Sequence, residues 1–334
     1  MSSSFTRLPR GARGLLALIL VASASAEATT PSVTEPAGIN LGLTSFYDGF
    51  PAAAPGQLSY LGYYRYTHAN AIKDNAGNKI DAFGKSNVDT WLTSHQFLYT
   101  FAHSPFDNAS LGLDLIIPIV GFNTDFGDAP AKLQANDAGF GDIFVGTYLQ
   151  MNPVMDTQGT PLFAQRFEIG FNVPTGKYDA HQDINPGANQ WSFTPTWAAT
   201  WLFAPRASLN WRLQYLVNFN NTRPASSTPL DWKGESVERT RAGQLAWLNF
   251  AAEYEVAPKW HLGINGYYLK QISDDKVNGD DLPNSREQVL GIGPGVMWNH
   301  SPNNTLTLNF YTETAVENRL RNSAIVNLFY IHGF

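Results

Sequence analysis

Seven charged side chains are candidates for chemistry inside an enclosed polar space. They are Arg65, Asp114, Asp142, Arg166, Glu168, Arg212 and Glu253. A charge held away from water is costly unless it is paired, so an ion-pair network that fills a cavity is one interpretation. The other is a pore, because rings of charged side chains set the field and width of channels. The set can serve both purposes, and we predict that Asp114, Arg166, Glu168 and Arg212 compensate one another.

Catalysis would need a nucleophile and a base within hydrogen-bonding reach of each other. Ser94 and His95 are adjacent, but neighbours on a strand point to opposite faces. His261 and His300 lie next to predicted short turns, where histidines are ordinarily solvated. Neither a Gly-x-Ser-x-Gly elbow nor a His-Glu-x-x-His site occurs. We therefore predict no catalytic residue and no enzymatic activity.

An acidic stretch offers oxygen ligands for a cation. Asp274, Asp275, Asp280 and Asp281 suit calcium by chemistry, but their spacing does not match an EF-hand loop, and a solvated loop is the simpler interpretation. Cysteine is absent, which removes disulfides and thiolate metal sites. We predict neither a metal nor a cofactor. A net charge of -6 without runs of Lys or Arg also argues against nucleic acid as a partner.

The composition indicates what surrounds these side chains. Only 15% of residues are charged and 13% are aromatic, against roughly 25% charged in an average soluble domain. The mean hydropathy is nevertheless -0.22. Beyond the first thirty residues no apolar run approaches the roughly 20 residues that a spanning helix needs. A membrane β-barrel, whose strands alternate apolar and polar residues, fits this combination. A large soluble β-sandwich is the competing interpretation.

Segments with β-branched and aromatic enrichment, partial period-two alternation and flanking turn residues predict strands. There are twelve, an even number as in bacterial single-chain barrels. They begin near Leu58, Val88, Ala109, Gly139, Leu162, Gln190, Ala207, Gln244, Trp260, Gln288, Thr305 and Ala324.

The connections between these segments alternate in length. The short ones are His103–Asn108, Asn152–Thr160, Ala204–Arg206, Ala257–Lys259 and Ser301–Asn303, all with a proline, which stops a ladder. The long ones are Ala69–Asn87, Asn123–Ala138, Thr175–Asn189, Asn221–Arg239, Ser273–Arg286 and the shorter Thr314–Leu320. Short periplasmic turns and long extracellular loops are typical of outer-membrane barrels. The predicted fold is therefore all-β, a transmembrane antiparallel β-barrel of about 12 strands over residues 58–334.

Alternation assigns the two faces of the predicted sheet. Leu113 and Leu115 flank Asp114, and Phe167 lies between Arg166 and Glu168. The apolar set is expected to meet lipid and the charged set to face the lumen. Because no backbone group can stay unpaired in hydrocarbon, such a sheet has to close on itself.

The ends of the chain indicate export. Residues 1–26 carry three arginines, then the apolar stretch Gly14–Ala22, then Ala24-Ser25-Ala26, the layout of a secretory signal peptide. Residues 27–57 do not alternate, and we expect either a periplasmic tail or a plug in the lumen. The final strand ends on the aromatic Phe334, the type of signal that barrel-assembly machinery reads, although His332 departs from the usual apolar residue.

The chain resembles the MetA-pathway phenol-degradation family of outer-membrane transporters. The resemblance depends on the order of short motifs: Asp48-Gly49-Phe50-Pro51 through Pro55-Gly56, Asp74–Asn78, Gly139-Phe140-Gly141-Asp142, Pro174–Tyr178, Asn185-Pro186-Gly187, Lys270–Lys276 and Gly293–Val296. It implies an outer-membrane barrel of a Gram-negative bacterium that passes small, often aromatic, compounds. No binding residue is carried over from the family.

The expected function is passive uptake of small hydrophobic or aromatic compounds across the outer membrane. The partners would be those solutes, outer-membrane lipid and, through Phe334, the assembly machinery. One alternative is a structural or adhesin-like barrel with a closed lumen. The least favoured is an outer-membrane hydrolase with a Ser/His pair on the rim.

Overall fold

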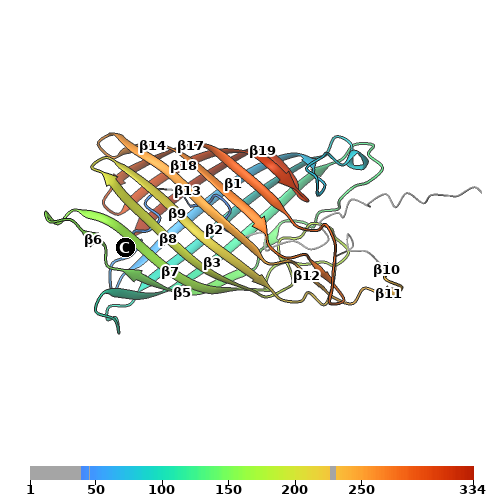
Figure 1. Cartoon of the computed structure of the whole chain (residues 1–334), viewed down its shortest axis with the longest axis horizontal. Helices are drawn as coiled ribbons and strands as arrows, with labels where there is room; N and C mark the ends of the chain where they lie inside the picture. The colour runs from blue at the N-terminus through green and yellow to red at the C-terminus, as the bar shows by residue number, and fades with distance from the viewer. Residues whose placement is uncertain (1–38, 45, 226–230) are drawn as a thin grey trace, which may run out of the picture.

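A computed structural model describes residues 39–44, 46–225 and 231–334. These residues form a closed antiparallel barrel of twelve long strands, in which the last strand pairs with the first (Figure 1). The strands are β1 (Leu58–Ile72), β2 (Asn87–Thr100), β3 (Ala109–Asp125), β5 (Ile143–Met151), β7 (Pro161–Val173), β8 (Ser192–Ala204), β9 (Ala207–Asn218), β13 (Leu245–Ala257), β14 (Trp260–Gln271), β17 (Gln288–Ser301), β18 (Asn304–Glu317) and β19 (Leu320–Gly333). The predicted fold class is confirmed.

The remaining elements are short. β4 (Gly139–Phe140) pairs with β3, and β6 (Val154–Met155) pairs with β7. Beyond one end of the barrel lie β10 (Asp231–Trp232) with β11 (Glu235–Ser236), and β12 (Thr240–Arg241) with β15 (Lys276–Val277) and β16 (Asp280–Asp281). A 3-10 turn, η1, covers Asp81–Phe83. No helix in the described part of the chain is long and apolar enough to cross a membrane.

The strands begin within two residues of the predicted positions, with two exceptions. β19 starts at Leu320 rather than near Ala324. The strand predicted from Gly139 is interrupted at Gly141 and Asp142, where the Asp142 carboxylate accepts the backbone N–H groups of Gly176 and Ala188 at 2.9 and 2.8 Å. A backbone that turns to make these contacts leaves the ladder, so β5 begins only at Ile143.

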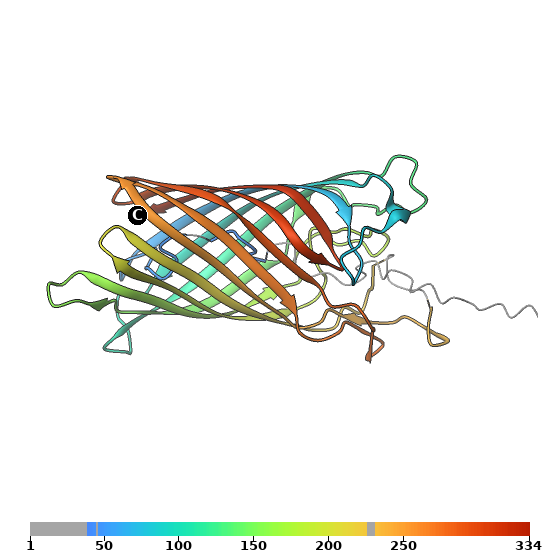
Figure 2. The ribbon, with the colours of Figure 1, turned by 45° about the horizontal axis from the view of Figure 1, so that its top comes forward.

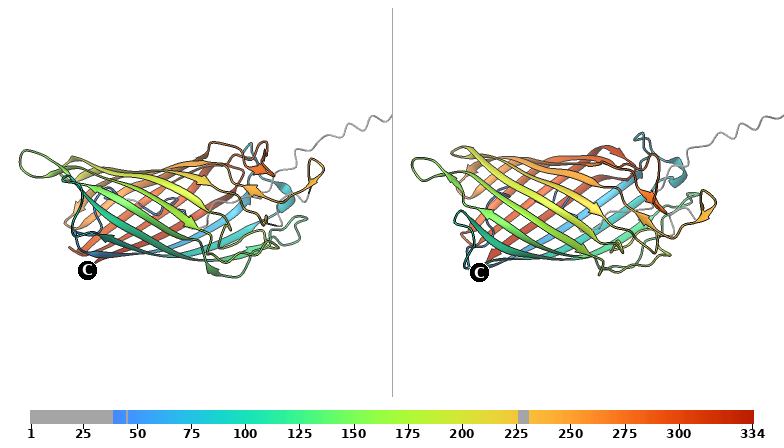
Figure 3. Two further views of the ribbon diagram at one scale, coloured as in Figure 1. Left: turned by 90° about the horizontal axis from the view of Figure 1, so that it is seen from below. Right: turned by 60° about the horizontal axis from the view of Figure 1, so that its bottom comes forward.

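Short and long connections lie at opposite ends of the barrel (Figure 1, Figure 3). We call these the short-turn end and the long-loop end. Three predicted long loops are shorter than expected, because β1, β3 and β18 continue to Ile72, Asp125 and Glu317. The extension of β1 packs with the loops in a separate apolar cluster that includes Ile72, Phe83, Phe126 and Leu133.

The two faces of the sheet differ as alternation predicts. On β3, Leu113 and Leu115 are 48% and 37% exposed, whereas Asp114 between them is 2% exposed. On β7, Phe167 and Ile169 are exposed and Arg166 and Glu168 are buried. The apolar face is thus turned outward, and the polar face encloses the lumen.

Candidate functional site

Residues 39–44 and 46–57, here called the inner segment, lie inside the barrel. Their first half contacts inward side chains near the long-loop end. Asn249 accepts the Gly42 N–H at 2.9 Å, and Asn327 donates to the Gly42 carbonyl at 2.6 Å. The Trp247 indole donates to the Asn40 carbonyl at 3.0 Å. Figure 2 shows this segment in blue, enclosed by the strands and extending toward the short-turn end.

The second half of the inner segment lies against β5, β7 and β8. Gly49 donates its N–H to Thr200 Oγ1 at 3.0 Å, and its carbonyl accepts from Gln150 Nε2 at 2.9 Å. A Cβ at Gly49 would lie 2.3 Å from the Ala164 carbonyl oxygen, which is an impossible contact. This position therefore requires glycine, because the segment approaches the barrel wall backbone to backbone.

An ion pair joins the inner segment to the wall. Arg212 on β9 donates from Nε and Nη2 to the two carboxylate oxygens of Asp48, at 2.8 and 2.6 Å. Less than a tenth of either side chain is exposed. The direct partner of Arg212 is thus Asp48, a residue that the sequence analysis did not single out, although Arg212 also lines the smaller cavity together with Asp114 and Glu168. Asp48 is the sole charge between Pro36 and Gln57, and this isolation is the signal that could have identified it.

Asp114, Arg166 and Glu168 form a second cluster across β3, β5 and β7. Asp114 accepts from Gln96 Nε2 at 2.6 Å, and its carboxyl adjoins that of Glu168. The closest approach of Arg166 to Glu168 is 3.9 Å, from Nε to Oε2, which exceeds hydrogen-bonding distance. Arg166 also lies over the Tyr148 ring, 5.5 Å from its centroid. The predicted proximity of these three charges is therefore present, but the pairing of Arg166 is loose.

The other three candidates lie apart from this cluster. Arg65 on β1 is half-buried and donates to the Leu41 carbonyl of the inner segment. Glu253 on β13 accepts from Ser208 Oγ at 2.6 Å and is bound by His261 at 2.8 Å. Asp142 lies outside the long strands, in the interruption between β4 and β5. Burial raises the pKa of the Asp142 carboxyl, although its two backbone N–H donors act in the opposite direction.

The histidines correct one expectation. His261 is buried, not solvated, because it is the second residue of β14 and faces inward to Glu253. Proximity to a turn does not decide the face of a strand. His300 is exposed, as expected. His95 bonds to the Tyr60 hydroxyl at 2.8 Å, on the face opposite to the buried Ser94. Ser208 and His261 both contact Glu253. In a catalytic pair the serine hydroxyl would instead bond to the histidine ring.

The acidic stretch makes ion pairs with neighbouring cations. Asp274, Asp280 and Asp281 pair with Arg286, Lys233 and Lys276, respectively. Asp275 accepts the Gly243 N–H at 2.8 Å. Among the described residues there is no group of three or more His, Cys, Asp or Glu side chains placed to hold a metal ion.

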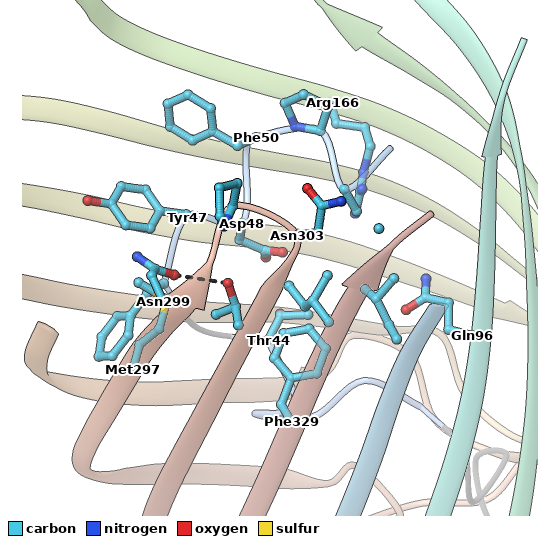
Figure 4. A pocket seen from close by; sticks show the side chains of 18 of the residues that line it. Thr44, Tyr47, Asp48, Phe50, Gln96, Arg166, Met297, Asn299, Asn303 and Phe329 are labelled. Carbon is cyan, nitrogen blue, oxygen red and sulfur yellow. Dashed lines mark hydrogen bonds between the residues drawn. The ribbon is translucent and has the colours of Figure 1, made fainter. Parts of the chain in front are cut away.

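A cavity of about 340 Å³ opens beside the inner segment at the short-turn end (Figure 4). Arg166 and Arg212 line it, together with aromatic rings from the inner segment and the wall. A smaller cavity of about 50 Å³ lies farther toward the long-loop end and is lined by Asp114 and Glu168. Tyr63, Gln96 and Arg212 border both cavities. These three side chains therefore lie between the two cavities.

An apolar belt around a closed barrel, a polar lumen and loops sorted by length define an outer-membrane β-barrel protein. The model of the family described as "Putative MetA-pathway of phenol degradation" matches residues 69–328. The chain belongs to this family, as its motifs predict, and its fold is that of a solved outer membrane channel.

Two solved channel structures are similar to this chain, and the first of them shares its fold. The COG4313 outer membrane channel from Pseudomonas putida F1 is 17% identical, with a TM-score of 0.71 over 86% of this chain and 98% of that chain. The TodX monoaromatic hydrocarbon channel (deltaS2 mutant) is 10% identical, with a TM-score of 0.47 over 88% of this chain and 96% of that chain. No curated protein sequence matches this chain.

Proposed function

We propose that the protein is a channel for passive uptake of small hydrophobic or aromatic compounds across the outer membrane. The observation that carries the proposal is the cavity of about 340 Å³ inside the lumen, walled by Phe46, Phe50 and Phe329. Aromatic walls with a few polar groups are typical of sites for small organic molecules. A strictly structural barrel has no need of such a space. The family description, which refers to phenol degradation, supports the same solute class.

In this proposal the inner segment is a plug that can leave its position against the barrel wall. It is held against the wall by hydrogen bonds, by the Asp48–Arg212 ion pair and by the apolar packing of Leu41, Leu43 and Phe46. The barrel's own strand pairing involves none of residues 39–57. A solute in the cavity would pass Tyr63, Gln96 and Arg212, the side chains between the two spaces. No energy-coupling motif is apparent in the sequence, so we propose diffusion down a gradient.

Two contacts with the cell belong to the proposal. The belt of exposed Leu113, Phe167 and Ile169 is proposed to contact outer-membrane lipid. Phe334 is proposed as the signal for barrel-assembly machinery, because its ring is 63% exposed although its N–H pairs with the Leu58 carbonyl at 3.1 Å. The predicted signal peptide, residues 1–26, lies outside the described residues.

A closed barrel with a structural or adhesive role is the second candidate, and the number of bonds that hold the inner segment favours it. We propose no catalytic activity.

Proteoliposomes with lipopolysaccharide in the outer leaflet separate the two candidates. A channel should speed the entry of labelled 4-hydroxybenzyl alcohol, a neutral single-ring compound, relative to protein-free liposomes. Proteoliposomes that contain the heat-denatured protein serve as the control. Equal entry with and without the native protein would support the closed barrel.

A further inference from the structure

Arg166 is a buried cation whose guanidinium is loosely paired. It is 4% exposed, and in the described part of the chain its Nε has no hydrogen-bond partner. Its charged neighbours are the carboxylates of Glu168, 3.9 Å from Nε, and Asp114, and it lies over the Tyr148 ring. A guanidinium has five N–H donors, and a buried donor without an acceptor is costly. This arrangement indicates that an anionic acceptor from outside the chain completes the site.

The charges around the larger cavity favour an anion. Arg166, Arg212 and Asp48 line it, so it holds two cations and one carboxylate. Asp48 is bound through both oxygens to Arg212, whereas the nearest carboxylate to Arg166, that of Glu168, is 3.9 Å from Nε. Asp114 and Glu168 line the smaller cavity. Among the side chains that line the larger cavity, the cations therefore outnumber the carboxylates.

The walls of the same cavity fit a flat ring. Phe46, Phe50 and Phe329 supply apolar surface, and a volume of about 340 Å³ is near the lower end for small-molecule sites. Figure 4 shows Arg166 from β7 and Asn303 from the turn between β17 and β18 reaching into this space, with Phe50 on one side and Phe329 on the other. Asn303 offers a second polar group at the exposed rim.

We infer that this cavity binds single-ring aromatic carboxylates, with Arg166 as the residue that binds the carboxylate. Planar guanidinium donors match the two oxygens of a carboxylate, as a lysine ammonium does not. The ring lies against the phenylalanines and the carboxylate against Arg166. The inference rests on the proposed function and makes it more specific, since it identifies an acidic subset of the aromatic solutes.

Calorimetry on the full-length protein in nanodiscs tests the inference without any variant. Benzoate should bind at least tenfold more tightly than benzamide, which has the same ring but no charge, and more tightly than acetate, which has the charge but no ring. A tenfold ratio corresponds to about 1.4 kcal/mol. Equal affinities for benzoate and benzamide, or for benzoate and acetate, would overturn the inference.

Two variants then assign the carboxylate contact. Arg166→Gln should weaken benzoate binding at least tenfold and leave benzamide binding unchanged, and Arg166→Lys should restore it only in part. Arg206→Gln is the matched control, because Arg206 is an exposed cation at the same end, over the outward Tyr254 ring. Folding of each variant is checked by heat-modifiable migration. Unchanged benzoate binding in a folded Arg166→Gln protein would refute the assignment.

The test separates this inference from the proposed function. Entry of neutral 4-hydroxybenzyl alcohol into proteoliposomes depends on an open route and not on Arg166. If neutral compounds enter but benzoate does not bind selectively, the carboxylate site is wrong and the channel stands. If neither occurs, the channel itself is wrong.

Discussion

The ion pair between Asp48 and Arg212 is predicted to hold the inner segment in the lumen. Asp48→Asn removes the anion and leaves the guanidinium of Arg212 buried without a counter-charge. Both side chains are less than a tenth exposed, so solvent screening reduces the interaction little. Breaking one partner of such a buried pair costs about 3–5 kcal/mol. Because the Asp48 side chain forms no part of a β-ladder, this cost falls on the seating of the segment and not on the barrel.

The magnitude converts into a measurable population. About 3 kcal/mol raises the ratio of released to seated inner segment by roughly 10²-fold, since each 1.4 kcal/mol is a factor of ten. We expect Asp48→Asn to raise single-channel conductance in planar bilayers and to make the chain near Tyr47 and Phe50 sensitive to protease. Heat-modifiable migration of the barrel should be unchanged. Asp107→Asn is the control, because Asp107 is an exposed carboxylate in a short turn at the same end.

A double substitution tests whether the unpaired charge on Arg212 causes the release of the inner segment. Asp48→Leu combined with Arg212→Met replaces the pair by apolar side chains and leaves no unpaired charge, which is commonly neutral or stabilising for buried pairs. The double variant should therefore be less conductive and more protease-resistant than Asp48→Asn. If Asp48→Asn shows the conductance and protease resistance of the unaltered protein, the ion pair does not seat the segment.

Three further predictions concern other parts of the molecule. Gly49→Asn should displace the inner segment, because its Cβ would lie 2.3 Å from a wall carbonyl. Gly159→Asn is the control for the same conductance measurement, because asparagine tolerates the positive φ of this exposed turn and no atom lies within 4 Å of its Cβ. Leu113→Arg should lower the free energy of unfolding in lipid by about 2–4 kcal/mol if Leu113 is near the membrane midplane. An unchanged urea midpoint of unfolding would show that the lipid and lumen faces of β3 are assigned the wrong way round. Deletion of Phe334 should reduce the amount of barrel in outer-membrane fractions without changing its refolding in detergent; normal amounts would exclude its role as an assembly signal.

Local physics explains why the sequence predicted the barrel. A strand places alternate side chains on opposite faces, so Leu113, Asp114 and Leu115 assign a lipid face and a lumen face without reference to any distant residue. Prolines such as Pro205 and Pro302, flanked by other turn residues, located the short turns. Pro118, Pro195 and Pro294 lie inside long strands, so a proline alone does not mark a turn in this chain. The closed sheet then follows from the need to pair every backbone group in hydrocarbon. An even number of strands allows the last strand to pair antiparallel with the first.

Boundaries were less accurate where a distant contact competes with the ladder. The gap at Gly141 and Asp142 depends on N–H groups of Gly176 and Ala188, some 34 and 46 positions away in the chain. The position of His261 next to a turn likewise suggested solvent, and only its bond to Glu253 shows that it faces inward. Periodicity contains no information on either contact.

The lumen was decided by tertiary structure. Alternation placed Arg166, Glu168, Asp114 and Arg212 on inward faces, but the partner of Arg212 is Asp48, which is 164 positions away in a segment without periodicity. Closure of the barrel brings β9 around this segment and gives Arg212 its counter-ion, and it leaves Arg166 facing an aromatic cavity with loose pairing. A strand's face is fixed by its own neighbours along the chain, whereas the partner of a lumen charge depends on which side chains closure and the inner segment bring within hydrogen-bonding distance.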